Sequence, residues 1–420
     1  MFLNLLAGRS KIIILLLIIV FVLGSCTVLT RSALYYKADI DDHKIFPHYE
    51  MEEPDEKFIF QQGKTCLSDS FYVDVNDTVK QGLNPFLEST STTAFLVIRN
   101  DSILFEEYFG GYSKEDISTF FSVSKSVTSL LVGIAIDEGY ISGINDPVTK
   151  YIEELNDADP MFQKLTIRHL LQMRAGLKCD ENYSTPFSGM ARLYYGTNQL
   201  GMLRRMEFEY EPGTKHEYQS ASTAILGIVV EKATKRNLAQ YFEEKVWIPL
   251  GMENTGTWSL DDNRHKSAKA YSGLNATARD LAKIGRLYIN KGKYKDKQIV
   301  SEEWIKQTLT PNPGNDNYQY QWYNFSGSGT DTTGNRNFPD STSALKTRNI
   351  KYKKYQNYDI WKDESKDKWR LSLYTGQYYA LGIMHQVLFI DPEKNIIIVR
   401  LGEKKDTNYL SIMYKLSNYL

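Results

Sequence analysis

The sequence predicts a mixed α/β (α+β) fold in which an antiparallel sheet is built from both chain ends, is flanked by helices and carries an inserted, mostly helical lobe. Strand-like runs at residues 94–99 and 103–108 precede the middle of the chain, and similar runs at 386–390 and 395–401 stand near its end. Between about 146 and 290 the apolar residues recur mostly at helical spacing. This order indicates one sheet with a helical lobe inserted into it.

The composition is that of an ordinary globular protein. The chain has 420 residues, of which 42% are hydrophobic and 24% charged, so it can bury a large core. A formal net charge of −1 argues against nucleic acid or an acidic substrate as an electrostatic partner. The six histidines form neither a His-x-His nor a His-Glu-x-x-His spacing. The sequence therefore predicts no metal site and no cofactor.

The N-terminus has the pattern of an export signal. Arg9 and Lys11 precede an uncharged apolar run over residues 12–23, and small residues follow just before Cys26. This ending resembles a bacterial lipoprotein box, which implies lipidation of Cys26 after cleavage. The alternative is an uncleaved anchor, because the uncharged stretch continues to Thr30 and approaches the ~20 residues of a membrane span. Both alternatives predict a membrane-anchored protein of the cell envelope that faces the periplasm or the exterior.

The remaining cysteines leave two possibilities open. In an oxidising compartment Cys66 and Cys179 could form a disulfide, but two separate thiols fit the sequence equally well.

The first elements follow in order along the chain. Residues 27–85 are polar and predict a tether with an N-terminal extension, and residues 86–420 form the main domain. Asn100-Asp101 joins the first two strands as a hairpin. A buried helix then begins at Ser122 and ends near Gly139, because its apolar residues recur at i, i+3, i+4 and i+7.

The helical lobe and the C-terminal end follow the same logic. Thr166 is the predicted N-cap of a helix over residues 167–173, and further helices are predicted at 221–233 and 276–289. Residues 391–394 form a turn between the last two strands, and a final helix covers about 406–420.

Residues from about 325 to 369 interrupt this order. They are rich in Gly, Ser, Thr, Asn and Lys, with tyrosines and a tryptophan scattered among them. The sequence favours a solvated surface insertion. A lid or a partner-binding element is the alternative, and the export signal argues against nucleic acid as the partner.

The start of the buried helix places a serine and a lysine three positions apart. Residues i and i+3 share a helix face, so Lys125 can reach the hydroxyl of Ser122. A serine is a poor nucleophile until a neighbouring group accepts its proton. The same spacing recurs at Ser343/Lys346 and Ser365/Lys368, but in polar, loop-like sequence that we interpret as chance.

Four motifs in order resemble the serine β-lactamase and penicillin-binding-protein superfamily, in its class C-related, esterase-like branch. They are the Ser122/Lys125 pair, residues 165–177, Pro212-Gly213-Thr214 with Tyr218-Gln219-Ser220, and residues 274–281. The last resembles the subgroup that includes 6-aminohexanoate-dimer hydrolases. The resemblance covers roughly residues 90–420 and implies a β-lactamase/transpeptidase-like fold.

The resemblance also implies roles for the first site residues. Ser122 would be the acylated nucleophile, Lys125 its proton acceptor and Tyr218 the group that carries the proton to the leaving group. We expect a Lys125 cation to favour the Tyr218 phenolate. Ser220 stands where relatives often have asparagine, so it is a predicted substrate contact.

The third motif of the superfamily is altered in this chain. The best match is residues 382–386, where esterase-like relatives carry glycine in place of His385. His385 is therefore predicted to reshape the acyl pocket and to contact substrate. By resemblance, the backbone N–H groups of Ser122 and Gln386 would form the oxyanion hole.

These observations predict an exported serine hydrolase that acts through an acyl-enzyme on an ester, amide or lactam carbonyl of a small or peptide-like substrate. A true β-lactamase or D-alanyl-D-alanine carboxypeptidase is the alternative within the family. A non-catalytic sensor or binding protein of the cell envelope is the alternative outside it.

Overall fold

The computed structural model describes residues 27–35, 37–63, 67, 70–75, 79–183, 185, 187–312, 317–404 and 407–420. The predicted export signal at residues 1–26, with Cys26, lies outside this part of the chain, and so does Cys66. Among the helices of the described ranges, none is long and apolar enough to cross a membrane.

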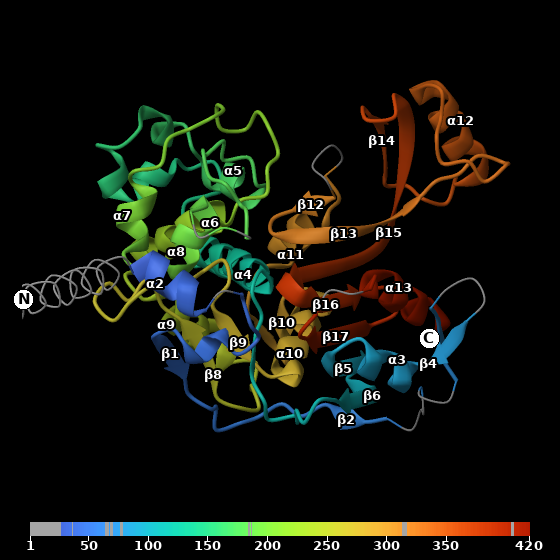
Figure 1. Ribbon diagram of the computed structural model, residues 1–420, viewed down its shortest axis with the longest axis horizontal. Coiled ribbons are helices and arrows are strands. Elements are labelled where there is room, and N and C mark those ends of the chain that lie inside the picture. Colours follow the sequence, from blue (N-terminus) through green and yellow to red (C-terminus); the bar gives the residue numbers. More distant parts are fainter. Residues whose placement is uncertain are drawn as a thin grey trace, which may run out of the picture.

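The main sheet of the described residues has nine strands and draws on both halves of the chain (Figure 1). Within it β17 pairs with β5, so the last strand lies beside the first strand of the main domain. All pairs are antiparallel except β2 with β6. This confirms the predicted sheet. From edge to edge the strands are β12 (Tyr318–Gln319), β13 (Trp322–Ser328), β15 (Lys368–Gly382), β16 (Gln386–Asp391), β17 (Ile396–Gly402), β5 (Thr92–Arg99), β6 (Ser102–Tyr108) and β2 (Gln61–Gln62), with β14 (Tyr358–Asp363) beside β15.

Helices cover both faces of this sheet, so β16 and β17 are buried at every position and are mostly apolar. Helices α4 (Val123–Asp137) and α10 (Ala278–Ile289) pack on one face, against Leu388 and Val399 among others. Helices α3 (Leu83–Ser89) and α13 (Tyr409–Tyr419) pack on the other face, against Val387 and Ile398 among others. A strand that is buried on both faces reads as a continuous hydrophobic run.

The predicted hairpin joins β5 to β6. Asn100 and Asp101 both have positive φ, at 50° and 60°, which is the backbone geometry of a two-residue turn that matches the twist of its strands. The buried helix α4 ends near Gly139, whose φ is +77°.

The inserted lobe is mostly helical, as predicted. Thr166 caps α5 through the main-chain N–H of His169, but this helix ends at Leu171 because Met173 has a φ of 54°. The predicted helix at 276 begins at Ala278, since the preceding residues form strand β9. The lobe contains α5 (Ile167–Leu171), α6 (Gly189–Tyr195), α7 (Gln199–Leu203), α8 (Ser220–Thr234) and α9 (Leu238–Phe242), and α11 (Glu302–Leu309) follows it.

The described part of residues 27–85 belongs to the folded body and is not a free tether. Helix α2 (Thr27–Leu34) packs on α6 through Val28, and Phe46, Met51 and Phe60 are buried in the main core. Strand β1 (His48–Met51) opens a small sheet with the order β1, β8 (Gly256–Ser259), β9 (Leu274–Ala276) and β7 (Ser118–Thr119). Two further hairpins are β3 (Tyr72–Asp74) with β4 (Lys80–Gly82) and β10 (Lys293–Tyr294) with β11 (Lys297–Gln298).

The insertion is folded and stands away from the body (Figure 1). Helix α12 (Ser341–Lys351) and the β14–β15 hairpin enclose a small core of their own, made by Phe338, Ala344, Leu371 and Leu373. Ser343 and Lys346 lie on α12, so our expectation of loop structure for that pair is wrong.

Candidate active site

Ser122 lies where the chain turns from β7 into α4. Phe121, directly before it, has a φ of 48°, a left-handed conformation that is strained for a bulky residue. Such strain is typical of functional sites because the surrounding structure must enforce it. The main-chain N–H of Val123 donates to Phe120 at 3.2 Å and closes the turn. The nucleophile candidate therefore sits on a fixed turn at the start of a buried helix.

Lys125 is 1% exposed and reaches Ser122 as predicted. Its Nζ lies 2.9 Å from Ser122 Oγ and 3.0 Å from the main-chain oxygen of Tyr271. Burial lowers the pKa of Lys125 to about 8, and the nearby charge of Glu181 opposes this shift. A substantial fraction of the amine is therefore neutral near physiological pH and can accept a proton.

Tyr218 joins this pair from the segment before α8. Lys125 Nζ lies 5.0 Å from the centre of its ring, and its hydroxyl takes part in a hydrogen bond with Ser122. Burial raises the pKa of Tyr218 well above 10, although the bond with Ser122 opposes this. Our expectation that Tyr218 would favour the phenolate form is therefore wrong. Burial removes the water that would stabilise the negative charge of a phenolate. Tyr218 stays protonated and can donate.

Glu181 is a part of the site that sequence reasoning missed. Its carboxylate accepts hydrogen bonds from the N–H of Ser220 at 2.8 Å, from Ser220 Oγ at 2.5 Å and from the Tyr183 hydroxyl at 2.7 Å. Ser220 is 1% exposed, so its hydroxyl is engaged with Glu181, and contact with a substrate stays a prediction. No local pattern marks Glu181, because only the fold brings it to the start of α8.

The segment before α10 holds the nucleophile turn in place. The N–H of Phe120 donates to the carbonyl of Leu274 at 3.0 Å, and the N–H of Leu274 donates to Ser124 Oγ at 3.0 Å. With the carbonyl of Tyr271 on Lys125, these bonds fix both catalytic candidates from one side. The sequence motif at 274–281 pointed to this region, but not to main-chain groups, which every residue carries.

The end of β15 passes directly beside the nucleophile turn. A Cβ atom at Gly382 would lie 2.3 Å from the carbonyl oxygen of Phe120, so only glycine permits this approach. A short turn, Ile383–His385, follows and leads into β16. The third motif is thus located beside Ser122, as the resemblance implied.

Gln386 does not have the free N–H that we assigned to the oxyanion hole. Its main-chain N–H donates to the carbonyl of Ile383, which closes the turn. Its side chain is fully buried and bonds to both main-chain groups of Gly402, at 2.6 and 3.1 Å. A donor that is already bonded cannot also stabilise an oxyanion without rearrangement.

His385 adopts a backbone conformation that favours glycine. Its φ is 59° and that of Met384 is 60°, and glycine adopts such values without steric cost. The imidazole ring packs edge-on against Tyr409 of α13, with ring centres 5.6 Å apart. It thus lies against the helix on the opposite face of the sheet from α4, which does not support the predicted reshaping of the acyl pocket.

Two other groups of side chains are relevant to metal or redox chemistry. Asp261, Asp262 and His265 lie within reach of a common ion, but the two carboxylates accept hydrogen bonds from several main-chain N–H groups. This is the arrangement of a structural turn. The thiol of Cys179 is free, and burial raises its pKa to about 12, so it is a weak nucleophile.

The fold and the Ser122, Lys125 and Tyr218 constellation define a protein of the β-lactamase and penicillin-binding-protein kind. The family model described as Beta-lactamase matches residues 79–410, and the chain belongs to this family. It is 29% identical over 238 residues to a 6-aminohexanoate-dimer hydrolase of Paenarthrobacter ureafaciens, covering 53% of this chain and 58% of that protein.

Other relatives agree with this assignment. A putative D-alanyl-D-alanine carboxypeptidase of Escherichia coli O157:H7 is 25% identical over 279 residues, covering 51% of this chain and 64% of the relative. The chain thus spans less than two thirds of the length of these relatives.

Solved structures share the fold. A putative 6-aminohexanoate-dimer hydrolase from Bacillus anthracis superposes with a TM-score of 0.71 and 22% identity, covering 90% of this chain and 91% of the other. A penicillin-binding protein from Bacillus halodurans gives 0.55 and 16%, covering 81% and 100%. At these identities the likeness concerns the fold.

Proposed function

We propose that this protein is an exported serine hydrolase that acts through an acyl-enzyme on an ester or amide carbonyl. The observation that carries the proposal is the contact of 2.9 Å between Lys125 Nζ and Ser122 Oγ, with the lysine buried and its pKa lowered to about 8. A binding protein has no physical need for an amine poised to activate a serine.

The acylation step follows from this geometry. Ser122 Oγ attacks the carbonyl carbon and its proton passes to neutral Lys125. The carbonyl oxygen becomes an oxyanion, and the tetrahedral intermediate collapses when the bond to the leaving group breaks. The leaving group takes a proton from the Tyr218 hydroxyl, which is in turn reprotonated from Lys125. Water then attacks the acyl-enzyme carbonyl and gives a proton to neutral Lys125. When the bond to Ser122 Oγ breaks, Lys125 returns this proton to Ser122, which releases the acid and restores the serine.

We assign the oxyanion hole to the main-chain N–H groups of Ser122 and Ile383. Ile383 directly follows Gly382, which passes against the Phe120 carbonyl. It is also the first residue of the short turn that the Gln386 N–H closes on the Ile383 carbonyl, so the bond that closes this turn does not use the N–H of Ile383. Losing one such donor typically costs about 2.7–4 kcal/mol of transition-state stabilisation.

A β-lactamase or D-alanyl peptidase is the second candidate, and the relative named as a carboxypeptidase favours it. The strand end reads Gly382-Ile383 without a Lys-Thr-Gly triplet, and this favours the ester or small-amide substrate. We also propose that Cys26 is lipidated and holds the protein at the outer surface of the cytoplasmic membrane or in the periplasm.

The test is the intact mass of the full chain after treatment with a reactive fluorophosphonate and, separately, with a penicillin. We expect one phosphonate adduct, lost in Ser122→Ala and kept in Ser343→Ala, which removes the serine of the other helical Ser-x-x-Lys pair. Penicillin labelling or turnover would select the second candidate. A folded wild type that neither reagent labels would contradict the catalytic proposal and favour an envelope binding protein.

A further inference from the structure

The β14–β15 hairpin of the insertion has two distinct faces. Tyr358 and Ile360 pair with Leu373 and Leu371, and these side chains face α12 and the small core. Because successive side chains of a strand point to opposite faces, the residues between them point outward.

The outward face carries an exposed aromatic ring beside charged groups. Trp361 is opposite Arg370 in the register and is 44% exposed, and its indole N–H donates to Ser372 Oγ at 3.1 Å. Arg370 forms an ion pair with Asp363 at 3.1 Å, and this pair fixes the charged side chains on one side of the Trp361 ring. Lys368 lies opposite Asp363 and continues this face toward the tip of the hairpin.

A pocket of about 400 Å³ opens at that tip. It is lined by Asn335, Asn337, Pro339, Lys366 and Lys368. Within the described residues neither lysine forms an ion pair, and the Asn337 side-chain oxygen is buried without a hydrogen-bond partner. Lys368 belongs to both the pocket and the outward face, so the two form one surface.

The charge of the insertion supports a ligand of negative sign. Residues 336–370 hold ten Lys and Arg against five Asp and Glu, a net charge of +5 in a chain whose total is −1. An excess of this kind favours an anionic partner over a cationic one.

We propose that this surface, made by Trp361, Lys366, Lys368 and Asn337, binds an anionic glycan. The face of a sugar ring would pack on the indole, as apolar C–H groups do on aromatic surfaces. A carboxylate or phosphate of the glycan would lie between the two lysines, and a sugar hydroxyl would donate to the unpartnered oxygen of Asn337. The surface goes beyond the hydrolase activity, because it holds the enzyme on a polymer.

A lipid surface fits less well than a glycan. The chain enters the fold at α2, on the left of Figure 1, whereas the insertion projects at the upper right. If the N-terminus is anchored as we propose, the insertion points away from the membrane and toward the surrounding polymer.

The test measures binding of the full chain to a fluorescent polygalacturonate fragment by anisotropy. Dextran, which lacks charge, and polyphosphate, which lacks sugar rings, serve as comparison ligands. We expect Trp361→Ala and Lys366→Gln/Lys368→Gln each to weaken binding about tenfold, corresponding to ~1.4 kcal/mol. Trp361→Tyr should retain most of the affinity, which guards against a folding artefact.

The matched control is Lys353→Gln/Lys354→Gln, which removes the same charge from exposed residues just after α12. We expect it to weaken binding clearly less than Lys366→Gln/Lys368→Gln, because charges outside the surface act only at longer range, and we expect Ser122→Ala to leave affinity for the fragment unchanged. Three outcomes would overturn the proposal: no binding by the wild type, equal loss in the control pair, or polyphosphate binding that matches polygalacturonate and ignores Trp361. Failure of Ser122 labelling would leave this proposal intact.

Discussion

At the scale of single residues, the reactivity of Ser122 depends on the charge of Lys125. Only the neutral amine accepts a proton, and the pKa of Lys125 is lowered to about 8 by burial. We therefore expect kcat/KM for an activated ester to rise with pH through about 8 and then level. Lys125→Arg should be inactive throughout, because a guanidinium stays charged.

Lys269 provides the control for this measurement. It is also fully buried, with a pKa lowered to about 7 by desolvation, but its Nζ donates to the carbonyl of Tyr194. Lys269→Met should leave the pH at which kcat/KM rises unchanged. An activity that is flat between pH 6 and 9 in the wild type would contradict the role of Lys125.

The charge of Glu181 tunes the same group. This carboxylate raises the pKa of Lys125 against the larger effect of burial. Replacing it by the neutral isostere, Glu181→Gln, should lower that pKa and move the rise of kcat/KM to lower pH. Glu217→Gln, which removes a carboxylate directly before Tyr218, is the matched control. A rise that stays in place in Glu181→Gln, or moves upward, would show that Glu181 only holds α8.

At the scale of structural elements, the turn between β15 and β16 has a strained backbone that hydrogen bonds from Arg400 hold in place. Met384 and His385 are both left-handed, and non-glycine residues in that region cost of order 1–3 kcal/mol each. Arg400 of β17 is fully buried, and its Nη1 donates to the carbonyls of both residues, at 3.1 Å for His385. It also donates to the carbonyl of Thr90 at 3.2 Å.

We expect Arg400→Met to relax this turn and displace the N–H of Ile383. The loss of kcat should approach the 10²–10³ typical of a missing oxyanion donor, with a smaller change in KM. Adding His385→Gly should restore part of kcat, because glycine adopts the turn without strain.

Arg286→Met is the control for Arg400→Met. Arg286 pairs with Asp101 through two bonds of 2.7 Å at the far hairpin, so its loss should lower stability and spare kcat. A folded Arg400→Met enzyme with wild-type kcat would contradict the proposal that Arg400 holds this turn in its active conformation.

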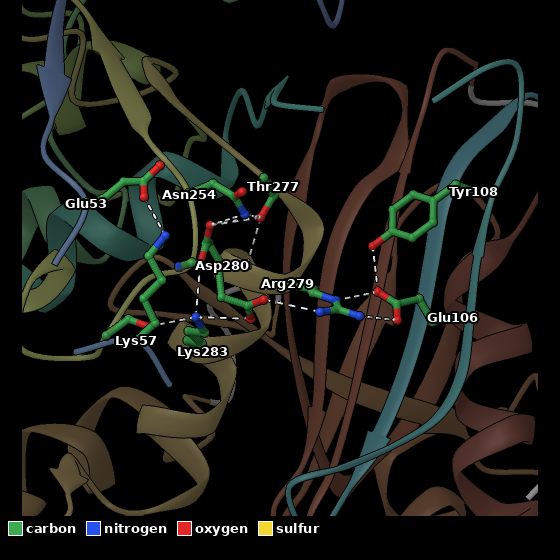
Figure 2. A network of polar contacts seen from close by, with 11 residues as sticks. Glu53, Lys57, Glu106, Tyr108, Asn254, Thr277, Arg279, Asp280 and Lys283 are labelled. Carbon is green, nitrogen blue, oxygen red and sulfur yellow. Dashed lines mark hydrogen bonds and ion pairs between the residues drawn. The ribbon is translucent and has the colours of Figure 1, made fainter. Parts of the chain in front are cut away.

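A second joint connects β6 to α10 (Figure 2). Arg279 of α10 binds Glu106 of β6 through bonds of 2.6 and 2.7 Å, and Glu253 at 3.2 Å. Burial opposes ionisation of Glu106, but the bonds from Arg279 and Tyr108 outweigh it and hold the pKa of Glu106 below its usual value.

Arg279→Met should leave a buried carboxylate unpaired and destabilise the protein by about 3–5 kcal/mol. Urea unfolding at pH 7 measures this, and Arg279→Met/Glu106→Gln should recover a part. Because the pKa of Glu106 is depressed in the fold, its contribution is present above pH 4.5 and is lost as the pH falls through the folded pKa. If the Arg279→Met protein is as stable as the wild type, the ion pair between Arg279 and Glu106 does not stabilise the fold.

At the scale of the whole molecule, Glu231 and Lys269 are buried groups that titrate near neutrality. Burial raises the pKa of Glu231 to about 7 from 4.5, and lowers that of Lys269 to about 7 from 10.5. Between pH 4.5 and 7 the native state holds more protons at Glu231 than the unfolded state does, so stability falls as the pH rises. Between pH 7 and 10.5 the unfolded state holds more at Lys269, so stability rises again.

These two groups should produce a minimum of unfolding free energy near pH 7. Urea titrations from pH 5 to 10 should show it, with the acidic slope reduced in Glu231→Gln and the alkaline slope reduced in Lys269→Met. If neither variant alters the pH dependence of the unfolding free energy, Glu231 and Lys269 have the same pKa values in the folded and the unfolded state.

The sequence by itself determined the family, the sheet built from both chain ends and the Ser122 helix. These follow from hydrophobic periodicity, turn residues and motif spacing, which are local properties of the chain. The same local rules predicted a tether with an N-terminal extension at residues 27–85, whose described part is packed into the folded body, and mistook the helix at Ser343 for a loop. Their stability comes from packing against distant residues, and local propensity does not record that packing.

Only the tertiary structure decided the electrostatics and the main-chain geometry of the site. The fold brings Glu181 into hydrogen-bond contact with Ser220, and burial sets the pKa values of Lys125 and Tyr218. The main-chain N–H of Gln386 already donates to the carbonyl of Ile383 within its turn. The strength of a charge depends on the water that has been removed around it, and a main-chain donor has no side chain to mark it. Both are properties of the folded arrangement of atoms.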